Sequence, residues 1–287
     1  MNLGVWWQGA RPRTLGAAVA PVLVGTAVAS RLGPISPGRA LLALVVAVGL
    51  QVGVNYANDY SDGVRGVDTL RQGPVRLTAS GLASQAAVKR AAFGAMSVAA
   101  AAGITLAVTV DLRLLLVGAV AVAAALLYSG GPRPYASAGL GEVAVLVFFG
   151  FVATCGSAYV QAGSVPRLAV ASALPVGLLA CAILLVNNLR DIESDRSAGK
   201  RTLAVRVGAS RTRRLYRASV IGALAAVVLL APAAPGALLA LLAAPLAVGA
   251  LRRVAPGSDA LDLVSGLIAT ARLQLVLSAL LAVGLVL

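Results

Sequence analysis

The sequence RLAVASALPVGLLACAILLVNNLRDIESD occupies residues 167–195 and combines two unlike parts. Residues 167–189 are almost wholly apolar, and this length matches the roughly 20 apolar residues that an α-helix needs to cross a bilayer. Two aspartates, Asp191 and Asp195, follow immediately. The stretch therefore predicts a membrane-spanning helix that ends in an acidic cluster at the membrane surface.

The rest of the chain repeats the apolar part of this pattern. Of 287 residues, 59% are hydrophobic and 12% are charged, whereas soluble domains typically carry about a quarter charged residues. The short alternating segments of an outer-membrane β-barrel are not seen. The sequence predicts a single all-α membrane domain over residues 1–287, a polytopic bundle of about nine transmembrane helices. The predicted spans are residues 14–30, 39–58, 87–109, 112–129, 141–161, 167–189, 213–231, 234–251 and 264–287.

The loops between the predicted spans divide into a basic set and a nearly neutral set. Most of the 24 Lys and Arg residues fall near the N-terminus and in alternate loops, and cytoplasmic loops carry such an excess. We therefore expect the N-terminus inside the cell and the C-terminus outside, with long inside loops at residues 59–86 and 190–212. These loops explain the net charge of +14 without nucleic-acid binding, which would require a basic patch on a recognisable binding fold.

Two similar acidic clusters lie at the two long inside loops. The spacing Asn55-x3-Asp59 ends the second predicted span, and Asn187-x3-Asp191 ends the sixth. Residues four apart share a helix face, so each Asn and Asp should project together. Such oxygen ligands suit Mg²⁺, which usually bridges one or two carboxylates to substrate phosphates. The predicted metal ligands are Asn55, Asp59, Asp62, Asp68, Asn187, Asp191 and Asp195.

Basic side chains flank both clusters, and the chain contains no histidine. Chemistry at the clusters must therefore rest on carboxylates, basic groups and bound ions. Arginine suits bidentate contact with phosphate, which predicts pyrophosphate binding by Arg71, Arg76, Lys200 and Arg201. Two alternatives remain open: the acids pair with loop arginines as solvated charges, or the chain is a secondary transporter. Transporter sites, however, usually lie near the bilayer midplane rather than at helix ends.

Two acid-rich motifs, residues 55–62 (NYANDYSD) and 187–195 (NNLRDIESD), resemble the UbiA superfamily of intramembrane aromatic prenyltransferases. Further matching segments are residues 10–15 (ARPRTL), 73–76 (GPVR), 128–132 (YSGGP), 139–142 (GLGE), 148–150 (FFG) and 199–206 (GKRTLAVR), and their order and spacing add to the match. Within the superfamily they are most similar to the branch that prenylates 1,4-dihydroxy-2-naphthoate. One feature departs from the superfamily pattern, in which the last two acids of the first motif are often four apart. Gly66 stands four residues after Asp62 and the next acid is Asp68, so the choice between these two aspartates stays open.

The resemblance implies a Mg²⁺-dependent reaction at the cytoplasmic face of the cell membrane. A polyprenyl group would pass from polyprenyl pyrophosphate to 1,4-dihydroxy-2-naphthoate with loss of carbon dioxide and pyrophosphate, giving demethylmenaquinone. An electron-rich ring supplies the nucleophile and cations stabilise the leaving group, so no Ser, Cys or His nucleophile is needed. Another acceptor, such as 4-hydroxybenzoate, is the alternative within the superfamily. The implied catalytic residues are Asp59, Asp62, Asp191 and Asp195, and the implied acceptor-binding residues are Arg11, Arg13, Tyr128 and Tyr135.

Overall fold

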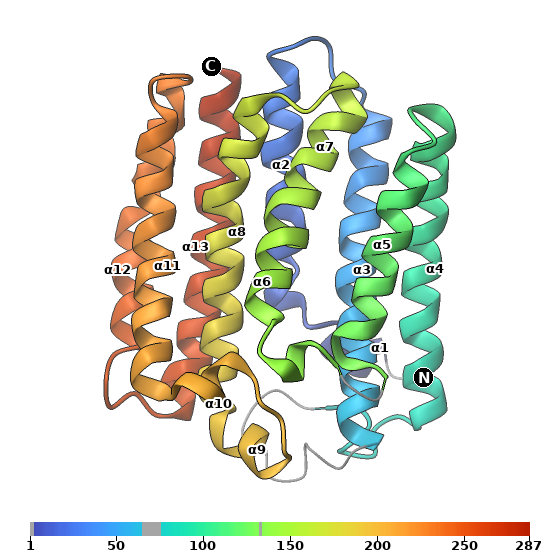
Figure 1. Ribbon diagram of the computed structural model, residues 1–287, viewed down its shortest axis with the longest axis vertical. Coiled ribbons are helices and arrows are strands. Elements are labelled where there is room, and N and C mark those ends of the chain that lie inside the picture. Colours follow the sequence, from blue (N-terminus) through green and yellow to red (C-terminus); the bar gives the residue numbers. More distant parts are fainter. Residues whose placement is uncertain (1–2, 65–75, 132–133) are drawn as a thin grey trace.

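The computed structural model describes residues 3–64, 76–131 and 134–287, and all regular structure within those ranges is helical. The long helices stand side by side along one axis (Figure 1). The C-terminus lies at one end of the bundle, and the short helices α9 and α10 lie at the other. The all-α membrane bundle predicted from the sequence is confirmed.

The helices follow the predicted spans along the chain. The first part holds α1 (Leu3–Ala10), η1 (Pro12–Thr14), α2 (Gly16–Ser30), α3 (Pro37–Val64), α4 (Gln85–Thr109) and α5 (Leu114–Ser129). The middle holds η3 (Ala136–Ala138), α6 (Gly141–Val145), the π-helix η4 (Leu146–Val152), α7 (Ala153–Ala162) and α8 (Arg167–Arg190). The last part holds α9 (Ile192–Ser197), α10 (Leu203–Val207), α11 (Ala209–Leu230), η5 (Pro235–Ala243), α12 (Ala244–Arg253) and α13 (Ala260–Val286).

The number of membrane spans differs from the nine expected. Within the described ranges, six helical segments are long and apolar enough to cross a membrane, and α1–η1 with α2, bent by 52°, would make a seventh. The apolar helix α5 has only 16 residues, and the first half of α11 carries four arginines. The count of nine is therefore not confirmed, because α5 is too short and α11 carries too many arginines.

Small residues allow other helices to approach α8 closely. In the most apolar part of α8, 72% of the residues are buried, the largest share among the six candidate spans. This helix packs against α2, α11, α13 and the π-helix. A Cβ atom added to Gly150 of the π-helix would lie 2.9 Å from the Cα of Gly177 on α8. Small residues at helix contacts are typical of membrane bundles, because lipid tails are as apolar as leucine and close packing drives association.

Helix α3 is longer than the span predicted at residues 39–58. It continues to Val64, so Asp59 and Asp62 lie on the helix rather than in the loop expected at residues 59–86. The loop expected at residues 190–212 likewise contains α9 and α10. Hydropathy marks where contact with lipid ends, whereas a helix continues for as long as its backbone hydrogen bonds do. The acidic residues of both clusters therefore lie on helices or directly after them.

The N-terminal helix α1 is fixed against the end of α3. The Asn55 side chain donates a hydrogen bond to the carbonyl oxygen of Ala10 at 2.9 Å, and the Tyr56 hydroxyl donates to that of Trp6 at 2.7 Å. The Trp6 and Tyr56 rings also meet edge to face, 5.8 Å between centroids. These contacts hold the bend between α1 and α2 and bring Arg11 beside the polar part of α3.

Candidate active site

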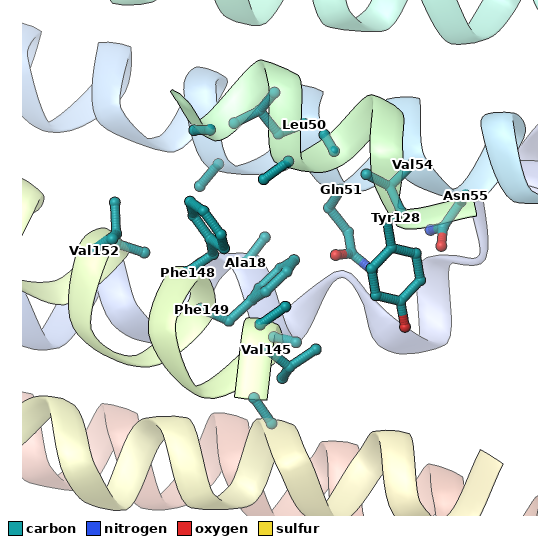
Figure 2. Close-up of a pocket in the computed structure, with 18 of the residues that line it drawn as sticks. Ala18, Leu50, Gln51, Val54, Asn55, Tyr128, Val145, Phe148, Phe149 and Val152 are labelled. Carbon is teal, nitrogen blue, oxygen red and sulfur yellow. The ribbon is translucent and has the colours of Figure 1, made fainter. Parts of the chain in front are cut away.

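A cavity of about 830 Å³ extends through the bundle and collects side chains from both acidic clusters. Its walls come from α2, α3, α5, α8 and the α6–η4–α7 segment, and most of them are apolar. Phe148, Phe149 and Val152 project into the apolar part (Figure 2). The polar end holds Arg11, Asn55, Asn58, Asp62, Arg76, Asn187, Asn188, Asp191, Asp195 and Lys200. Such a shape suits a ligand with an anionic head and a long hydrocarbon tail.

Asp62 connects the end of α3 to two basic side chains. Its Oδ2 atom lies 3.2 Å from a guanidinium nitrogen of Arg76, and its Oδ1 atom accepts a hydrogen bond from Nζ of Lys200 at 2.8 Å. Asp62 and Arg76 are both buried. Buried ion pairs of this kind are held by charge-assisted hydrogen bonds, which are shorter and stronger than neutral ones.

Asp59 has a different environment from Asp62. Its two carboxylate oxygens accept hydrogen bonds from the backbone N–H groups of Leu77, at 2.8 Å, and Thr78, at 2.9 Å. Asp59 is 1% exposed, and it is not among the described residues that line the cavity. Its carboxylate therefore fixes the turn that follows Arg76, and its predicted role as a metal ligand stays a prediction.

The second cluster places its three predicted ligands along one side of the cavity. The Arg190 guanidinium binds both carboxylate oxygens of Asp191 at 2.8 Å and also donates to Asn187 at 3.0 Å. Asp195 lies 3.7 Å from Nζ of Lys200 and accepts a longer hydrogen bond from the Thr202 hydroxyl at 3.5 Å. Asp191 and Asp195 are both buried, and Asn187 lines the cavity with them.

Lys200 joins the two clusters, because its ammonium group contacts Asp62 from the first and Asp195 from the second. The two motifs, more than 130 residues apart in the sequence, therefore meet at one point, in accord with the predicted convergence. Within the described ranges, no three acidic side chains gather closely enough to hold a metal on their own. The donors present are nonetheless the hard oxygen atoms that Mg²⁺ prefers.

Four other predicted residues lie away from the cavity or outside the described ranges. Asp68 and Arg71 fall between residues 64 and 76 and lie outside the described residues. Arg201 is exposed; its backbone N–H donates to the carbonyl oxygen of Ser137 at 2.9 Å, and it does not line the cavity. Arg13 is also exposed and absent from the lining, so neither side chain is brought to the other candidates.

The remaining acceptor candidates do line the cavity. Tyr128 and Tyr135 meet edge to face, with 5.5 Å between ring centroids, and the Tyr135 hydroxyl donates to the carbonyl oxygen of Ala124 at 2.8 Å. Burial raises the pKa of Tyr135, which keeps this donor protonated. Arg11 has left-handed backbone angles, φ 56° and ψ 63°, which a residue other than glycine adopts only when its surroundings hold it there.

Two cavity residues, Asn58 and Asn188, were missed by sequence reasoning. Asn58 lines the cavity between the two positions predicted at Asn55 and Asp62, and its buried Oδ1 atom has no hydrogen-bond partner among the described residues. Asn188 also lines the cavity and donates to the buried carboxylate of Glu142 at 3.0 Å. The signal for Asn58 is its spacing, three residues after Asn55 and four before Asp62, which places all three on one helix face.

Comparison with known proteins gives relatives over most of the chain. Residues 18–262 match the model of the UbiA prenyltransferase family. A 1,4-dihydroxy-2-naphthoate octaprenyltransferase of Mycobacterium tuberculosis is 49% identical over 90% of this chain and 89% of its own length. The protein of the same name from Escherichia coli is 41% identical over 76% of this chain and 73% of its own length.

Solved structures share the fold. An apo UbiA homologue from Aeropyrum pernix superposes with a TM-score of 0.72 at 20% identity, covering 94% of this chain and 97% of that one. A UbiA homologue from Archaeoglobus fulgidus, bound to GPP and Mg²⁺, superposes with a TM-score of 0.66 at 17% identity, covering 96% and 99%. The helical bundle, the paired acidic motifs at its polar end and these matches agree: the chain belongs to the UbiA prenyltransferase family.

Proposed function

We propose that the protein transfers a polyprenyl group from polyprenyl pyrophosphate to 1,4-dihydroxy-2-naphthoate, releasing pyrophosphate and carbon dioxide and forming demethylmenaquinol, the reduced form of demethylmenaquinone. The names of relatives that are 40–49% identical support this acceptor. The observation that carries the proposal is the contact of Lys200 with Asp62 and Asp195 at the end of a largely apolar cavity. This arrangement offers a charged site for the pyrophosphate and a lipid-like site for the tail.

The donor set at the polar end fits a divalent cation. Asp62, Asp191 and Asp195 supply carboxylate oxygens, and the orphaned amide oxygen of Asn58 adds a neutral one. Magnesium favours oxygen ligands and typically binds through few carboxylates plus substrate phosphates, which suits a site that the donor itself completes. A Mg²⁺ ion bound there would neutralise the negative charge that develops on the pyrophosphate. A UbiA homologue bound to GPP and Mg²⁺ supports this assignment.

The chain's own cations assist departure of the pyrophosphate. Lys200 and Arg76 face the polar end of the cavity, where they would stabilise the leaving oxygens as the allylic C–O bond breaks. The electron pair of that bond leaves with the pyrophosphate. The ring carbon bearing the carboxylate then donates an electron pair to the allylic cation, and loss of carbon dioxide returns a pair to the ring. No proton transfer is needed in these steps, in agreement with a chain without histidine.

We also propose that the polar end faces the cytoplasm. The basic residues gather around the loops at this end, including Arg190, Lys200 and the arginines of α11, and positive loops remain inside. The N-terminus would then lie inside and the C-terminus outside. A cysteine introduced at exposed Gly199 and another at Val286 should react with a membrane-impermeant thiol reagent from opposite sides.

The test is an acceptor screen with purified protein, Mg²⁺ and one polyprenyl pyrophosphate, with products read by mass. We expect 1,4-dihydroxy-2-naphthoate to gain the prenyl group and lose carbon dioxide. Transfer to 4-hydroxybenzoate with the carboxyl group retained, and none to the naphthoate, would select the alternative acceptor class. Absence of pyrophosphate release with every acceptor would contradict prenyl transfer itself.

A further inference from the structure

One polar side chain lies in the apolar wall of the cavity, away from the acidic clusters. Gln51 is near the middle of α3 and lines the cavity beside Leu50 and Val54 (Figure 2). Its amide has no hydrogen-bond partner within residues 3–64, 76–131 and 134–287. An amide within the membrane is costly unless a partner satisfies it, and polar residues there are usually functional. Gln51 therefore points to a ligand that carries a polar atom at this depth.

Two aromatic rings lie close to this amide. Figure 2 shows Tyr128 and Phe149 projecting into the cavity beside Gln51, from α5 and from the π-helix. Tyr128 is fixed by its edge-to-face contact with Tyr135. The Tyr128 hydroxyl has no hydrogen-bond partner in the described part of the chain. The two rings offer flat surfaces on which a planar ligand can stack.

The π-helix accounts for the position of Phe149. A π-helix closes its hydrogen bonds over one more residue than an α-helix, and such segments are often found at functional sites. Here it directs the consecutive residues Phe148 and Phe149 into the same cavity (Figure 2). The close contact of Gly150 with Gly177 on α8 holds the segment in place.

The aromatic pair also lies near the charged end of the cavity. The hydroxyl of Ser61, next to Asp62, donates at 2.7 Å to the carbonyl oxygen of Ser129, next to Tyr128. Tyr128 is therefore close to the proposed pyrophosphate site. Arg11 lines the same cavity and supplies positive charge for an anionic substituent. A ring bound here would lie within reach of the carbon released by the pyrophosphate.

We propose that Gln51, Tyr128 and Phe149 form the binding site for the aromatic acceptor, an inference that rests on the proposed prenyl transfer. The ligand class is a planar bicyclic phenol with a carboxylate. The ring packs between Tyr128 and Phe149, a ring hydroxyl bonds to the Gln51 amide, and the carboxylate faces Arg11. The acceptor site thus extends deeper into the membrane than the arginine and tyrosine motifs alone indicate.

The test measures steady-state kinetics of the full-length protein in detergent with Gln51→Leu and Phe149→Leu. Each variant should raise the KM for 1,4-dihydroxy-2-naphthoate about five- to tenfold, because each loses one hydrogen bond or one aromatic contact to the acceptor. The KM for the donor should be unchanged. Gln85→Leu and Phe93→Leu make the same changes at exposed positions of α4 and should alter neither constant.

A second measurement separates the hydroxyl contact from the ring contact. Naphthalene-2-carboxylate, which lacks both hydroxyls, serves as a competitive inhibitor. Its inhibition constant should be the same for the wild type and Gln51→Leu but higher for Phe149→Leu. A loss of inhibitor affinity in Gln51→Leu equal to the loss for the acceptor would contradict the hydroxyl contact.

The outcomes distinguish this site from the reaction itself. An unchanged acceptor KM in both variants, in a protein that still transfers the prenyl group, would overturn the acceptor site alone. A parallel rise in the donor KM would also overturn it, because that result indicates general distortion of the cavity. A wild-type protein that transfers nothing to the naphthoate would overturn the proposed function, and the acceptor site with it.

Discussion

Replacement of Asp59 by asparagine tests what this carboxylate does in the fold. Asp59 is 1% exposed and accepts two backbone hydrogen bonds, at 2.8 Å from Leu77 and 2.9 Å from Thr78. The side chain of Leu77 is fully buried against α1 and α3, and Arg76 beside it reaches Asp62. Asp59→Asn keeps the size of the side chain but leaves one acceptor oxygen, while its new NH₂ group faces a backbone donor.

The size of the effect follows from these two bonds. A hydrogen bond to a charged group contributes about 1.5–3 kcal/mol, and a buried donor left without an acceptor adds a penalty of similar size. The asparagine retains one neutral bond, so we expect about 2–4 kcal/mol less stability for the turn at residues 76–78. At about 1.4 kcal/mol per factor of ten, local opening becomes roughly 30- to 1,000-fold more frequent.

Hydrogen–deuterium exchange of the Leu77 and Thr78 amides measures this opening directly. Exchange should accelerate by the same factor in Asp59→Asn. Asp111→Asn is the control, since Asp111 bonds to Arg113 and Tyr159 beyond the far end of α4 and should leave the exchange of these amides unchanged. Equal exchange in the wild type and Asp59→Asn would contradict a role for this carboxylate in holding the Leu77 and Thr78 amides.

Three further predictions concern other parts of the molecule. Lys200→Met should raise the KM of the pyrophosphate donor about tenfold, because one charge-assisted contact with the donor is lost. An unchanged donor KM in a pyrophosphate-release assay would show that Lys200 does not bind the pyrophosphate. Gly150→Ala should lower stability by about 1–3 kcal/mol, because the new Cβ would lie 2.9 Å from a glycine of α8, whereas Gly94→Ala, with open space around it, should be neutral or stabilising in the same detergent melts. A hydrogen bond from Arg113 holds the pKa of Asp111 below its usual range, so the ionised carboxylate stabilises the fold above about pH 4 and this contribution is lost as the pH falls. The melting temperature of the wild type should therefore drop more between about pH 7 and pH 3 than that of Asp111→Asn; an equal drop would contradict the pairing.

Apolar runs located the helices but not their ends or internal breaks. The run at residues 39–58 predicts a helix, yet α3 continues to Val64 because helix hydrogen bonding persists beyond the lipid. The π-helix at Leu146–Val152 lies inside a run of ordinary hydropathy. Hydropathy is an average over many residues, so it cannot report a local change in hydrogen-bond register.

The helical repeat located much of the candidate site, and tertiary contacts decided the rest. Asp191 and Asp195 are four residues apart, and both line the cavity as that spacing indicates. Asn58 follows Asn55 by three residues and Asp59 follows it by four. By spacing alone, either residue could share the helix face of Asn55. Only the fold shows that Asn58 lines the cavity while Asp59 turns to the amides of residues 77 and 78.

The π-helix also limits how the length of the chain can vary. Each residue of an α-helix turns the chain by about 100°, and the wider turn at Leu146–Val152 accommodates one residue more than an α-helical turn would, so a further residue inserted there would rotate everything after it relative to everything before. Thr154 and Ser157, which now face α2 near Gly25, would then turn elsewhere. Chimaeras between relatives should therefore add no residue here even where the residues themselves are exchanged.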